Sequence, residues 1–395
     1  MKRPRVGFII QRYGAAVFGG AEIHCRALVQ RLAPHWSIEL LTTRAVDHMT
    51  WADALPAGVS DEDGVAVRRF GVDRPRNVAR FNRLSARILA HAHTLEEERA
   101  WMALQGPTCS ALQRHLETHA RDYDGFVLFN YLYATTYDSL PRLGGRPAYL
   151  LPLTHDEPPV YLRIFEDVFR APTGLVFNTP AERAFVGRRF PFALPPHTTI
   201  GMGIDLPADA DGARFRAKFG IDGPFMLYAG RIDESKGCDD LLRDFLLYRE
   251  RLGRGARSLA LVLCGAGSLP IPRHDAIRYV GRLNEQEKWD ALAAARCLVL
   301  PSRFESMSIV VLEAWAVGTP VLVNGLCAVS EAQCRRSGGG LFYRHGDEFG
   351  AAADWLAHDD ALCARLGAGG RAFVREQYAW PVVVQRHLDF IRFDS

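Results

Sequence analysis

The apolar positions of the chain form two kinds of pattern, which alternate along it. Short runs in which nearly every residue is apolar are typical of buried parallel strands, and apolar residues three and four apart are typical of helices. The first series is a strand at 5–10, a helix at 21–32 and a strand at 37–43. This order predicts a βαβ unit in a doubly wound parallel sheet. Further strands of the same sheet are predicted at 125–129, 148–152 and 174–177.

A segment rich in proline and glycine, residues 191–212, divides the chain and suits a linker. Beyond it, a second βαβ series is predicted. Its elements are strands at 224–229, 259–264, 276–281, 297–301 and 320–324 and a helix at 240–251. We therefore predict an α/β protein with two Rossmann-like, doubly wound parallel-sheet domains, at residues 1–203 and 204–380.

One apolar run differs from the others because it is too long for a strand and contains a carboxylate. Residues 309–317 predict a buried helix that Gly318 and Pro320 end, and Glu313 lies inside it. A buried carboxylate needs a partner, and either a nearby backbone or basic group or a bound ligand can supply one.

The ligand interpretation of this helix rests on what lies at its start. The free N–H groups of Met307, Ser308 and Ile309 would point toward a bound phosphate. Glu305, in the preceding loop, and Glu313 would flank such an anion and accept hydrogen bonds from hydroxyl groups. A sugar nucleotide carries both kinds of group.

Polar residues also follow several of the predicted strands. Gly19 and Gly20 come before the first helix, and His155 and Asn178 follow the strands at 148–152 and 174–177. Each is equally explained as an ordinary loop residue, and the glycine pair lacks the spacing of a dinucleotide-binding fingerprint. The carboxyl ends of parallel strands meet at one edge of a sheet, so these residues are expected to converge there.

Two cations follow the first strand of the second series, Arg231 and Lys236. Arginine binds phosphate oxygens with a planar fork, and lysine supplies a mobile point charge. A pair exposed to solvent needs no ligand, but at a strand end these two residues favour a diphosphate site.

The overall composition excludes several classes of protein. A net charge of +3 on 395 residues is small for a nucleic-acid-binding protein. The eight cysteines form no CxxC pair and are expected to be reduced thiols in a cytosol. The apolar stretch 6–10 is too short for a signal peptide or a spanning helix, so any contact with a membrane would be peripheral.

Residues 67–93 form a basic segment with a single acidic residue, Asp73. From Val78 onward the apolar residues have helical spacing, which predicts a cationic amphipathic helix. The helix is either solvated at the surface or in contact with an anionic lipid or an anionic acceptor.

Taken together, the motifs of the chain resemble those of the large retaining glycosyltransferase group called family 4, which has the GT-B fold. The resemblance runs over nearly the whole chain, at residues 18–22, 201–205, 230–237, 264–268, 279–284, 301–320, 329–331 and 338–347. It implies that the two domains face each other across a cleft and that a crossover helix, 381–395, packs back on the first domain.

The resemblance also implies roles for individual residues. The residues implied as catalytic are Arg231, Lys236, Glu305 and His155. The residues implied in donor binding are Gly19, Gly20, Gly265, Gly281, Arg282, Leu283, Met307, Ser308, Ile309 and Glu313. Arg231 and Lys236 would bind the donor diphosphate, Glu305 the sugar hydroxyls and Glu313 the ribose. Residues 306–308 differ from many members of the group, so the surface that faces the sugar is expected to differ.

The implied activity is transfer of a hexose from a UDP- or GDP-sugar to a hydroxyl of a glycan, a lipid-linked or a small-molecule acceptor. It would proceed with retention and without a metal or other cofactor, in the cytoplasm or at the inner face of the membrane. A GT-B nucleotide-sugar epimerase and an inactive sugar-nucleotide-binding protein are the alternatives, and an epimerase would act on the donor without an acceptor.

Overall fold

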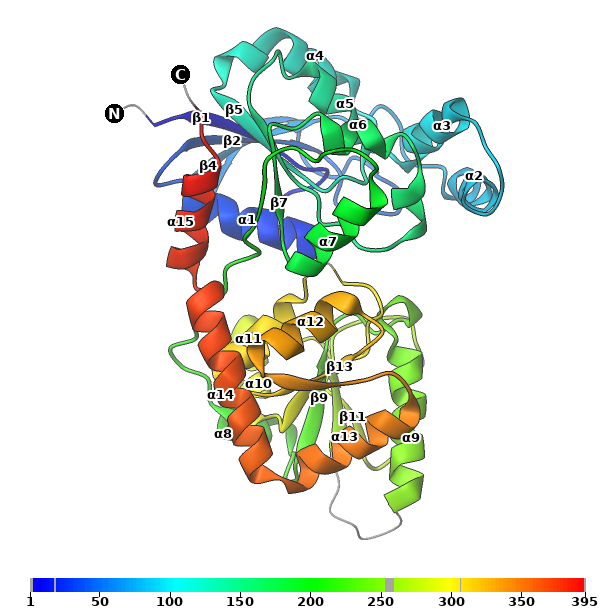
Figure 1. The fold of residues 1–395 in the computed structure, drawn as a ribbon, viewed down its shortest axis with the longest axis vertical. Helices are drawn as coiled ribbons and strands as arrows, with labels where there is room; N and C mark the ends of the chain where they lie inside the picture. Colours follow the sequence, from blue (N-terminus) through cyan, green and yellow to red (C-terminus); the bar gives the residue numbers. More distant parts are fainter. Residues whose placement is uncertain (1–2, 18, 253–258, 306, 394–395) are drawn as a thin grey trace. The chain divides into compact units, whose positions relative to one another are not determined.

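The computed structural model describes residues 3–17, 19–252, 259–305 and 307–393 of the chain. Contacts between Cα atoms divide it into two compact units (Figure 1). The first unit consists of Met1–Gly203 together with Val383–Ser395, and the second unit is Ile204–Val382. Each unit is built on its own sheet.

The sheet of the first unit has the strand order β3-β4-β2-β1-β5-β6-β7-β8. Its strands are β1 (Arg5–Ile9), β2 (Ser37–Thr43), β3 (Gly58–Glu62), β4 (Val65–Phe70), β5 (Gly125–Phe129), β6 (Ala148–Leu151), β7 (Gly174–Phe177) and β8 (His197–Thr199). All neighbours pair in parallel except β3 with β4. The predicted parallel sheet is therefore present, with one antiparallel strand at its edge.

Three strands of this sheet were not predicted. β3 is almost entirely exposed, and β4 contains Arg68 and Arg69, so neither forms an apolar run. β8 lies inside the segment predicted as a linker, 191–212, and pairs with β7 at the sheet edge. The linker prediction was wrong over these three residues, because an edge strand gains its partners from backbone pairing and needs no apolar pattern.

Helices lie on both faces of the first sheet (Figure 1). They are α1 (Gly20–Leu32), α2 (Val78–Ala90), α3 (Leu95–Gln105), α4 (Ser110–His119), α5 (Ala134–Ser139), α6 (Phe165–Arg170), α7 (Pro180–Arg189) and α15 (Trp380–Phe390). The segment after α15 packs on this unit: Phe393 contacts Trp36 edge to face, with 5.4 Å between the ring centroids, and the Tyr149 hydroxyl donates to the Arg392 carbonyl at 2.9 Å.

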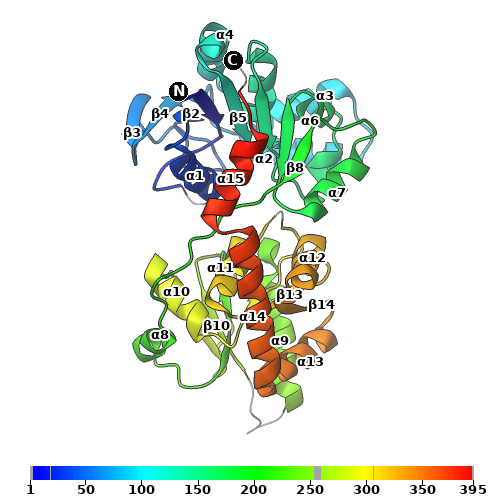
Figure 2. The same ribbon diagram turned by 60° about the vertical axis from the view of Figure 1, so that its left-hand side comes forward.

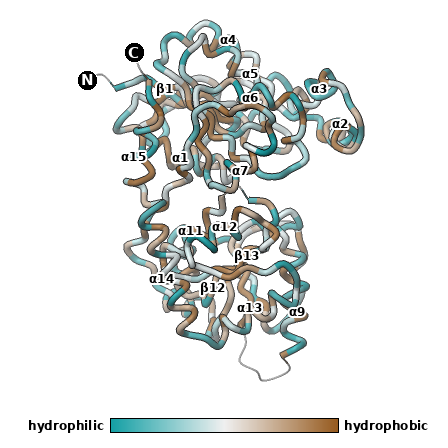
Figure 3. The backbone as a smooth tube through the Cα atoms, viewed as in Figure 1, coloured by the Kyte–Doolittle hydropathy of each residue, from teal (hydrophilic) through white to brown (hydrophobic). Residues whose placement is uncertain are grey.

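The sheet of the second unit is parallel throughout, in the order β11-β10-β9-β12-β13-β14. Its strands are β9 (Phe225–Ala229), β10 (Ala260–Cys264), β11 (Ile277–Tyr279), β12 (Cys297–Leu300), β13 (Val321–Asn324) and β14 (Gly340–Tyr343). Inner strands such as β12 and β13 are strongly hydrophobic (Figure 3). They are buried on both faces, as expected for a sheet covered by helices on each side.

The helices of the second unit are α8 (Gly212–Phe219), α9 (Cys238–Leu252), α10 (Glu285–Ala294), α11 (Ile309–Val317), α12 (Ala328–Ser337), α13 (Gly346–His358) and α14 (Asp360–Gln377). Both α9 and α11 were predicted, and α11 has the predicted bounds. Over the described residues, no helix combines the length and the apolar character needed to cross a bilayer. All eight cysteines are buried and unpaired.

The apolar helix α11 packs against α14, which runs alongside it (Figure 2). Glycines on α14 permit this close approach. A Cβ atom on Gly367 would lie 2.0 Å from the Gly318 carbonyl oxygen, and one on Gly370 would lie 2.2 Å from the Trp315 ring. Gly318, at φ 80°, ends α11 in the left-handed conformation that glycine adopts most readily.

We expect Gly367→Ala to destabilise the second unit, because the added methyl group meets a backbone carbonyl that cannot move away. Overpacking of this kind costs about 1–3 kcal/mol. The matched control is Gly350→Ala in α13, where the new Cβ would meet only Tyr248, at 3.8 Å. Alanine at such an open helical site is favourable by roughly 0.5–1 kcal/mol. Thermal unfolding followed by circular dichroism compares the two, and an unchanged midpoint for Gly367→Ala would contradict the close packing.

Candidate active site

Each sheet has a topological switch point, where the chain reverses the direction in which it adds strands to the sheet. In the second unit the chain runs outward from β9 to β10 and β11, and then returns to place β12 on the other side of β9. In the first unit the corresponding neighbours are β1 and β5. Loops leave the carboxyl ends of two such strands in opposite directions, and ligands of open α/β sheets bind in the space between them.

The predicted residues Lys236 and Glu305 meet at the switch point of the second unit. Lys236 lies in the loop after β9, and Glu305 lies in the loop after β12. The Lys236 Nζ atom donates to the Glu305 Oε1 atom at 2.8 Å, and the side chains are 30% and 11% exposed. The two charges are thus joined at an accessible place beside the strand ends.

The loop after β9 is built to hold Lys236 in this position. Asp233 caps the short 3-10 turn Glu234–Lys236 by accepting from the Lys236 backbone N–H at 3.0 Å. Gly237 follows at φ 73°, and a Cβ atom there would lie 2.8 Å from the Pro301 carbonyl oxygen. Only glycine satisfies both demands without strain. The side chain of Asn324, the last residue of β13, donates to the same Pro301 carbonyl at 2.9 Å.

Arg231 lies in the same loop but is held less firmly than Lys236. Its side chain is 62% exposed, with an Nη1 atom 3.5 Å from the Asp233 carboxylate and an Nη2 atom 3.5 Å from the Ser235 hydroxyl. These long contacts leave the guanidinium able to turn toward an anionic ligand. Arg231 and Lys236 therefore supply two positive charges within one short loop.

Glu313 has a partner that the sequence analysis missed, Lys288 on α10. The Lys288 Nζ atom donates to Glu313 Oε1 at 2.6 Å, and the side chains are 25% and 11% exposed. Burial raises the pKa of Glu313, and the ammonium group opposes that shift. Burial lowers the pKa of Lys288, but attraction to Glu313 and Glu285 outweighs it, so the net shift is upward. The Glu313 carboxyl group therefore accepts a hydrogen bond from Lys288, although the net effect of its surroundings is to raise its pKa.

Glycines connect the loops after β9, β10 and β11. Gly265 has φ 135°, and a Cβ atom there would lie 1.8 Å from the Gly230 carbonyl oxygen. Its N–H donates to the carbonyl of Gly281, which itself has φ 76°. Arg282 and Leu283 follow directly and lead to Asn284, the N-cap of α10. The predicted base-binding residues therefore adjoin the helix that carries Lys288.

The start of α11 provides backbone donors beside Glu305. Ile309 is the first helical residue, and Ser308 is the N-cap without a side-chain cap bond. Met307 and Ser308 are buried. The first N–H groups of a helix have no carbonyl partner within it, so they form an anion-binding position. Ser306, one of the residues that depart from the glycosyltransferase pattern, lies outside the described residues.

In the first unit, Gly19 and Gly20 form the start of α1, as N-cap and first helical residue. Sequence analysis missed the buried ion pair beside them. Arg12 Nη2 lies 2.6 Å from Glu22 Oε1, and a Cβ atom on Gly19 would approach the other Glu22 oxygen to 2.2 Å. The carboxylate of Glu22, the third helical residue, therefore folds back over the helix start, and a larger residue at position 19 would have to displace it.

His155, after β6, is oriented by a carboxylate. Its Nε2 atom lies 3.3 Å from Glu157 Oε2, and the Tyr131 hydroxyl donates to the other oxygen at 2.8 Å. Glu182 secures the neighbouring loops by accepting from the backbone N–H groups of Thr154 at 2.6 Å and Asn178 at 2.7 Å. Burial raises the pKa of Glu182 to about 8, with these hydrogen bonds opposing the shift.

The structure thus gathers most of the predicted donor-site residues at one edge of the second sheet. Gly19, Gly20 and His155 belong to the first unit, at the carboxyl edge of its own sheet. Lys288, Arg12 and Glu22 were not singled out from the sequence. A lysine three residues into a helix, directly after the predicted base-binding loop, was the available signal for Lys288.

Comparison with known proteins shows which family the chain resembles. Residues 223–359 match the family described as Glycosyl transferases group 1. The chain is 27% identical to D-inositol 3-phosphate glycosyltransferase of Streptomyces scabiei over 93% of its own length and 84% of that protein. Two further relatives, at 30% and 29% identity, align over about half of this chain and about half of their own length.

The fold has clear counterparts among solved structures. Sucrose-phosphate synthase from Thermosynechococcus elongatus superimposes with a TM-score of 0.71 at 18% identity, covering 98% of both chains. HepE from Anabaena in complex with UDP gives a TM-score of 0.70 at 12% identity, again over 98% of both chains. Two Rossmann-like units of this kind define the GT-B fold. The chain therefore resembles the group 1 glycosyltransferases in sequence and has the GT-B fold.

We predict that Lys288 and Glu313 are energetically coupled. Lys288→Met would leave a buried carboxylate without its cation. We expect it to lower the free energy of unfolding by on the order of 2–3 kcal/mol, which is less than the cost of breaking a fully buried ion pair because Lys288 is partly exposed. Adding Glu313→Gln removes the uncompensated charge, so the double variant should lose less than the sum of the single losses. Urea denaturation of all four proteins measures the coupling, and additive losses would refute it.

Proposed function

We propose that this glycosyltransferase moves a hexose from a UDP- or GDP-sugar to a hydroxyl of a glycan, a lipid-linked or a small-molecule acceptor. The proposed reaction retains the anomeric configuration and needs no metal ion. The observation that carries the proposal is the pair of Lys236 and Glu305 at the switch point of the second sheet, with Arg231 and the start of α11 beside it.

The positive groups at this edge would hold the donor diphosphate. Lys236 has three N–H donors, so it can keep its bond to Glu305 and still donate to a phosphate oxygen. Arg231 would add a planar fork, and the N–H groups at the start of α11 would add further donors. As the bond to the sugar breaks, negative charge grows on the leaving diphosphate. Fixed positive groups at that point lower the barrier in place of a metal ion.

The two glutamates would bind hydroxyl groups on opposite sides of the diphosphate. Glu305 would accept from the transferred sugar, and Glu313 would accept from the ribose. Lys288 opposes the rise in the pKa of Glu313 that burial causes, and a carboxylate paired with an ammonium group still has lone pairs that can accept from hydroxyl groups. Gly265 and residues 281–283 would border the nucleotide, because their loops adjoin α10.

Because both glutamates are already bonded to lysines, we propose that the retaining reaction uses no protein nucleophile. A nucleophilic carboxylate must be free to attack the anomeric carbon, whereas Glu305 is tied to Lys236 and Glu313 to Lys288. In the proposed front-face step, the acceptor oxygen bonds to the anomeric carbon on the face from which the diphosphate leaves. The carbon–oxygen bond to the phosphate breaks, and a phosphate oxygen takes the proton of the acceptor hydroxyl.

The first unit would provide the acceptor side. His155, oriented by Glu157, would lie near the transferred sugar, and Gly19 and Gly20 would approach the diphosphate. The relative from Streptomyces scabiei is named for inositol 3-phosphate, which favours a small phosphorylated polyol among the acceptor classes. The eight buried, unpaired cysteines are consistent with a cytoplasmic reaction. Peripheral contact with a membrane would be through charge, because α2 packs its apolar face on α3.

Lys236→Ala should lower turnover by orders of magnitude, since it removes a charge from the leaving diphosphate and a partner from Glu305. Lys218→Ala is the matched control: Lys218 is an exposed lysine of the same unit, paired with Glu287. Release of nucleoside diphosphate from UDP- and GDP-sugars, with acceptor present, measures both. Near-normal turnover of Lys236→Ala would refute the diphosphate assignment, and conversion of the donor sugar without acceptor would indicate an epimerase.

EDTA should leave turnover unchanged, because the proposed charge neutralisation comes from side chains and backbone N–H groups. The enzyme is dialysed against EDTA and assayed for nucleoside diphosphate release with and without added Mg²⁺ or Mn²⁺. Loss of activity after dialysis, restored by either ion, would contradict the metal-free mechanism.

A further inference from the structure

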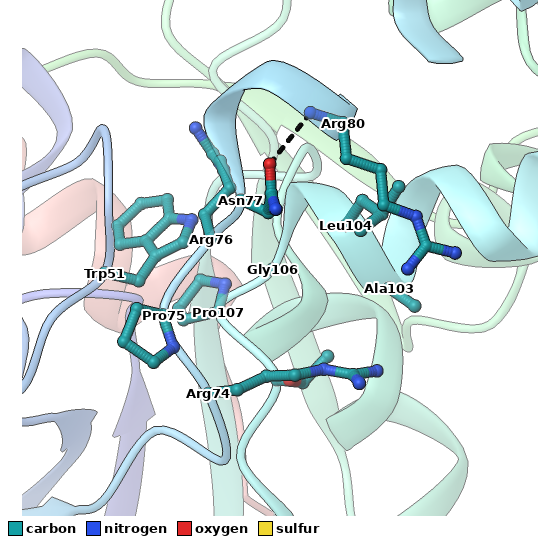
Figure 4. Close-up of a pocket in the computed structure, with 11 residues that line it drawn as sticks. Trp51, Arg74, Pro75, Arg76, Asn77, Arg80, Ala103, Leu104, Gly106 and Pro107 are labelled. Atoms are coloured by element: carbon teal, nitrogen blue, oxygen red, sulfur yellow. Dashed lines mark hydrogen bonds between the residues drawn. The ribbon is translucent and has the colours of Figure 1, made fainter. Parts of the chain in front are cut away.

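A separate pocket in the first unit is lined by arginines (Figure 4). It has a volume of about 220 Å³ and lies between the loop after β4, the start of α2 and the loop between α3 and α4. It is lined by Trp51, Arg74, Pro75, Arg76, Asn77, Arg80, Ala103, Leu104, Gly106, Pro107 and Thr108. Pockets for whole organic ligands span about 300–1,000 Å³, so this one is sized for a single small group.

The three arginines of the pocket have no carboxylate partner. None of the ion pairs found among the described residues involves Arg74, Arg76 or Arg80. Arg74 and Arg76 lie in the loop just before α2. A second pocket of similar size, in the other unit, is different. There Arg214 pairs with Asp290 at 2.5 Å, and Lys218 pairs with Glu287. At Arg74 and Arg80, the first pocket therefore carries positive charge that is not balanced by an ion pair among the described residues.

Arg76 holds the loops of the pocket together through hydrogen bonds and an aromatic contact. Its guanidinium donates to the Gln105 carbonyl at 3.0 Å and to the His48 carbonyl at 3.2 Å. It also stacks 4.9 Å from the centroid of the Trp51 ring. Burial lowers the pKa of Arg76 to about 10, and attraction to Tyr133 and Asp47 opposes that shift only in part.

Arg74 and Arg80 are available for a ligand. Both are exposed, and both guanidinium groups extend to the side of the pocket away from Trp51 (Figure 4). Asn77 accepts from the Arg80 N–H through its Oδ1 atom at 2.9 Å, so its amide N–H groups remain as donors beside them. Two arginine forks with a neutral donor on the same pocket suit the oxygens of a phosphate group.

The pocket is connected to the carboxyl edge of the sheet through Trp51. This residue follows β2, and its ring contacts Tyr133, after β5, with 5.3 Å between the centroids. On its other side, the Arg12 guanidinium lies 5.9 Å from the ring. Trp51 has φ 56°, a conformation that is costly for a bulky residue and is found most often at functional sites. Trp51 thus links the pocket to the loop that precedes Gly19.

The helix hairpin beside the pocket favours a small anion over a lipid surface. On α2, Phe81, Leu84 and the buried Ile88 pack into the core cluster that contains Trp101 of α3. The Trp101 Nε1 atom donates to Ser85 at 2.8 Å and secures the hairpin. The apolar face of α2 is therefore used within the protein and is not available for insertion into a bilayer.

We propose that this arginine pocket binds a phosphate group through Arg74 and Arg80 and, resting on the function proposed above, that the group belongs to the acceptor substrate. The acceptor would be a small phosphorylated molecule, anchored beside the carboxyl edge that carries His155 and Gly19. The phosphate stays intact: the pocket positions a neighbouring hydroxyl for transfer and takes no part in bond breaking.

The test is arginine footprinting of the full-length protein with phenylglyoxal, read residue by residue by peptide mass spectrometry. Inorganic phosphate should slow modification of Arg74 and Arg80 by about fivefold or more, as a bidentate contact of about 1 kcal/mol or more requires. Arg83 is the internal control, because it is an exposed arginine of the same helix outside the pocket. In an Arg74→Gln variant the protection of Arg80 should fall, and in Arg83→Gln it should persist.

Vesicles of phosphatidylglycerol and phosphatidylcholine distinguish a lipid headgroup from a free phosphate. Protection of Arg83 and Arg87 together with the pocket arginines by vesicles, and none by phosphate, would overturn the proposal in favour of a membrane-facing surface. Equal rates at Arg74, Arg80 and Arg83 with and without phosphate would also overturn it. The readout needs no nucleotide sugar, so it stands apart from any failure of the proposed transfer reaction, which Lys236→Ala tests.

Discussion

The adjacency of β9 and β12 is the constraint on which the candidate site depends. These strands are far apart in the sequence, yet they pair in parallel at the centre of the sheet and bring two loops to the same point. One loop contributes Lys236 and the other contributes Glu305, and the 2.8 Å ion pair joins them. The order of strands, more than any single motif, decides which side chains can act together, because each loop leaves its strand end in a fixed direction.

The apolar pattern of the sequence predicted the buried strands and helix α11. It did not predict the edge strands, which are stabilised by backbone hydrogen bonds to a neighbouring strand. Helix α11 has its predicted bounds because an apolar run with a glycine stop has few alternatives. The edge strands β3 and β8 have exposed or polar side chains, and only the position of a neighbouring strand stabilises them. A local pattern contains no information about that neighbour, so the segment 191–212 resembled a linker throughout.

The same limit applies to the candidate site. The sequence singled out four charged residues because each follows a predicted strand or lies in an apolar helix: Arg231, Lys236, Glu305 and Glu313. Lys288 was not found, since a lysine near the start of a helix is ordinary until Glu313 is placed opposite it. Of the two explanations for Glu313, a basic partner is present in the structure, and a carboxylate held in this way still has lone pairs to offer a ligand. The two explanations are therefore compatible.

The basic residues of the two candidate sites differ in whether they have acidic partners, and this difference affects which ligands each site could bind. At the carboxyl edge of the second sheet, Lys236 and Lys288 are each paired with a glutamate, so a ligand bound there would fit between existing partners and could use both signs of charge. In the pocket of the first unit, Arg74 and Arg80 form no ion pair with any described acidic residue, and burial lowers the pKa of Arg76. A paired site suits a ligand that presents both hydroxyl groups and phosphates, as a sugar nucleotide does. An unpaired site suits a ligand that brings negative charge alone, because the anion supplies the missing partner.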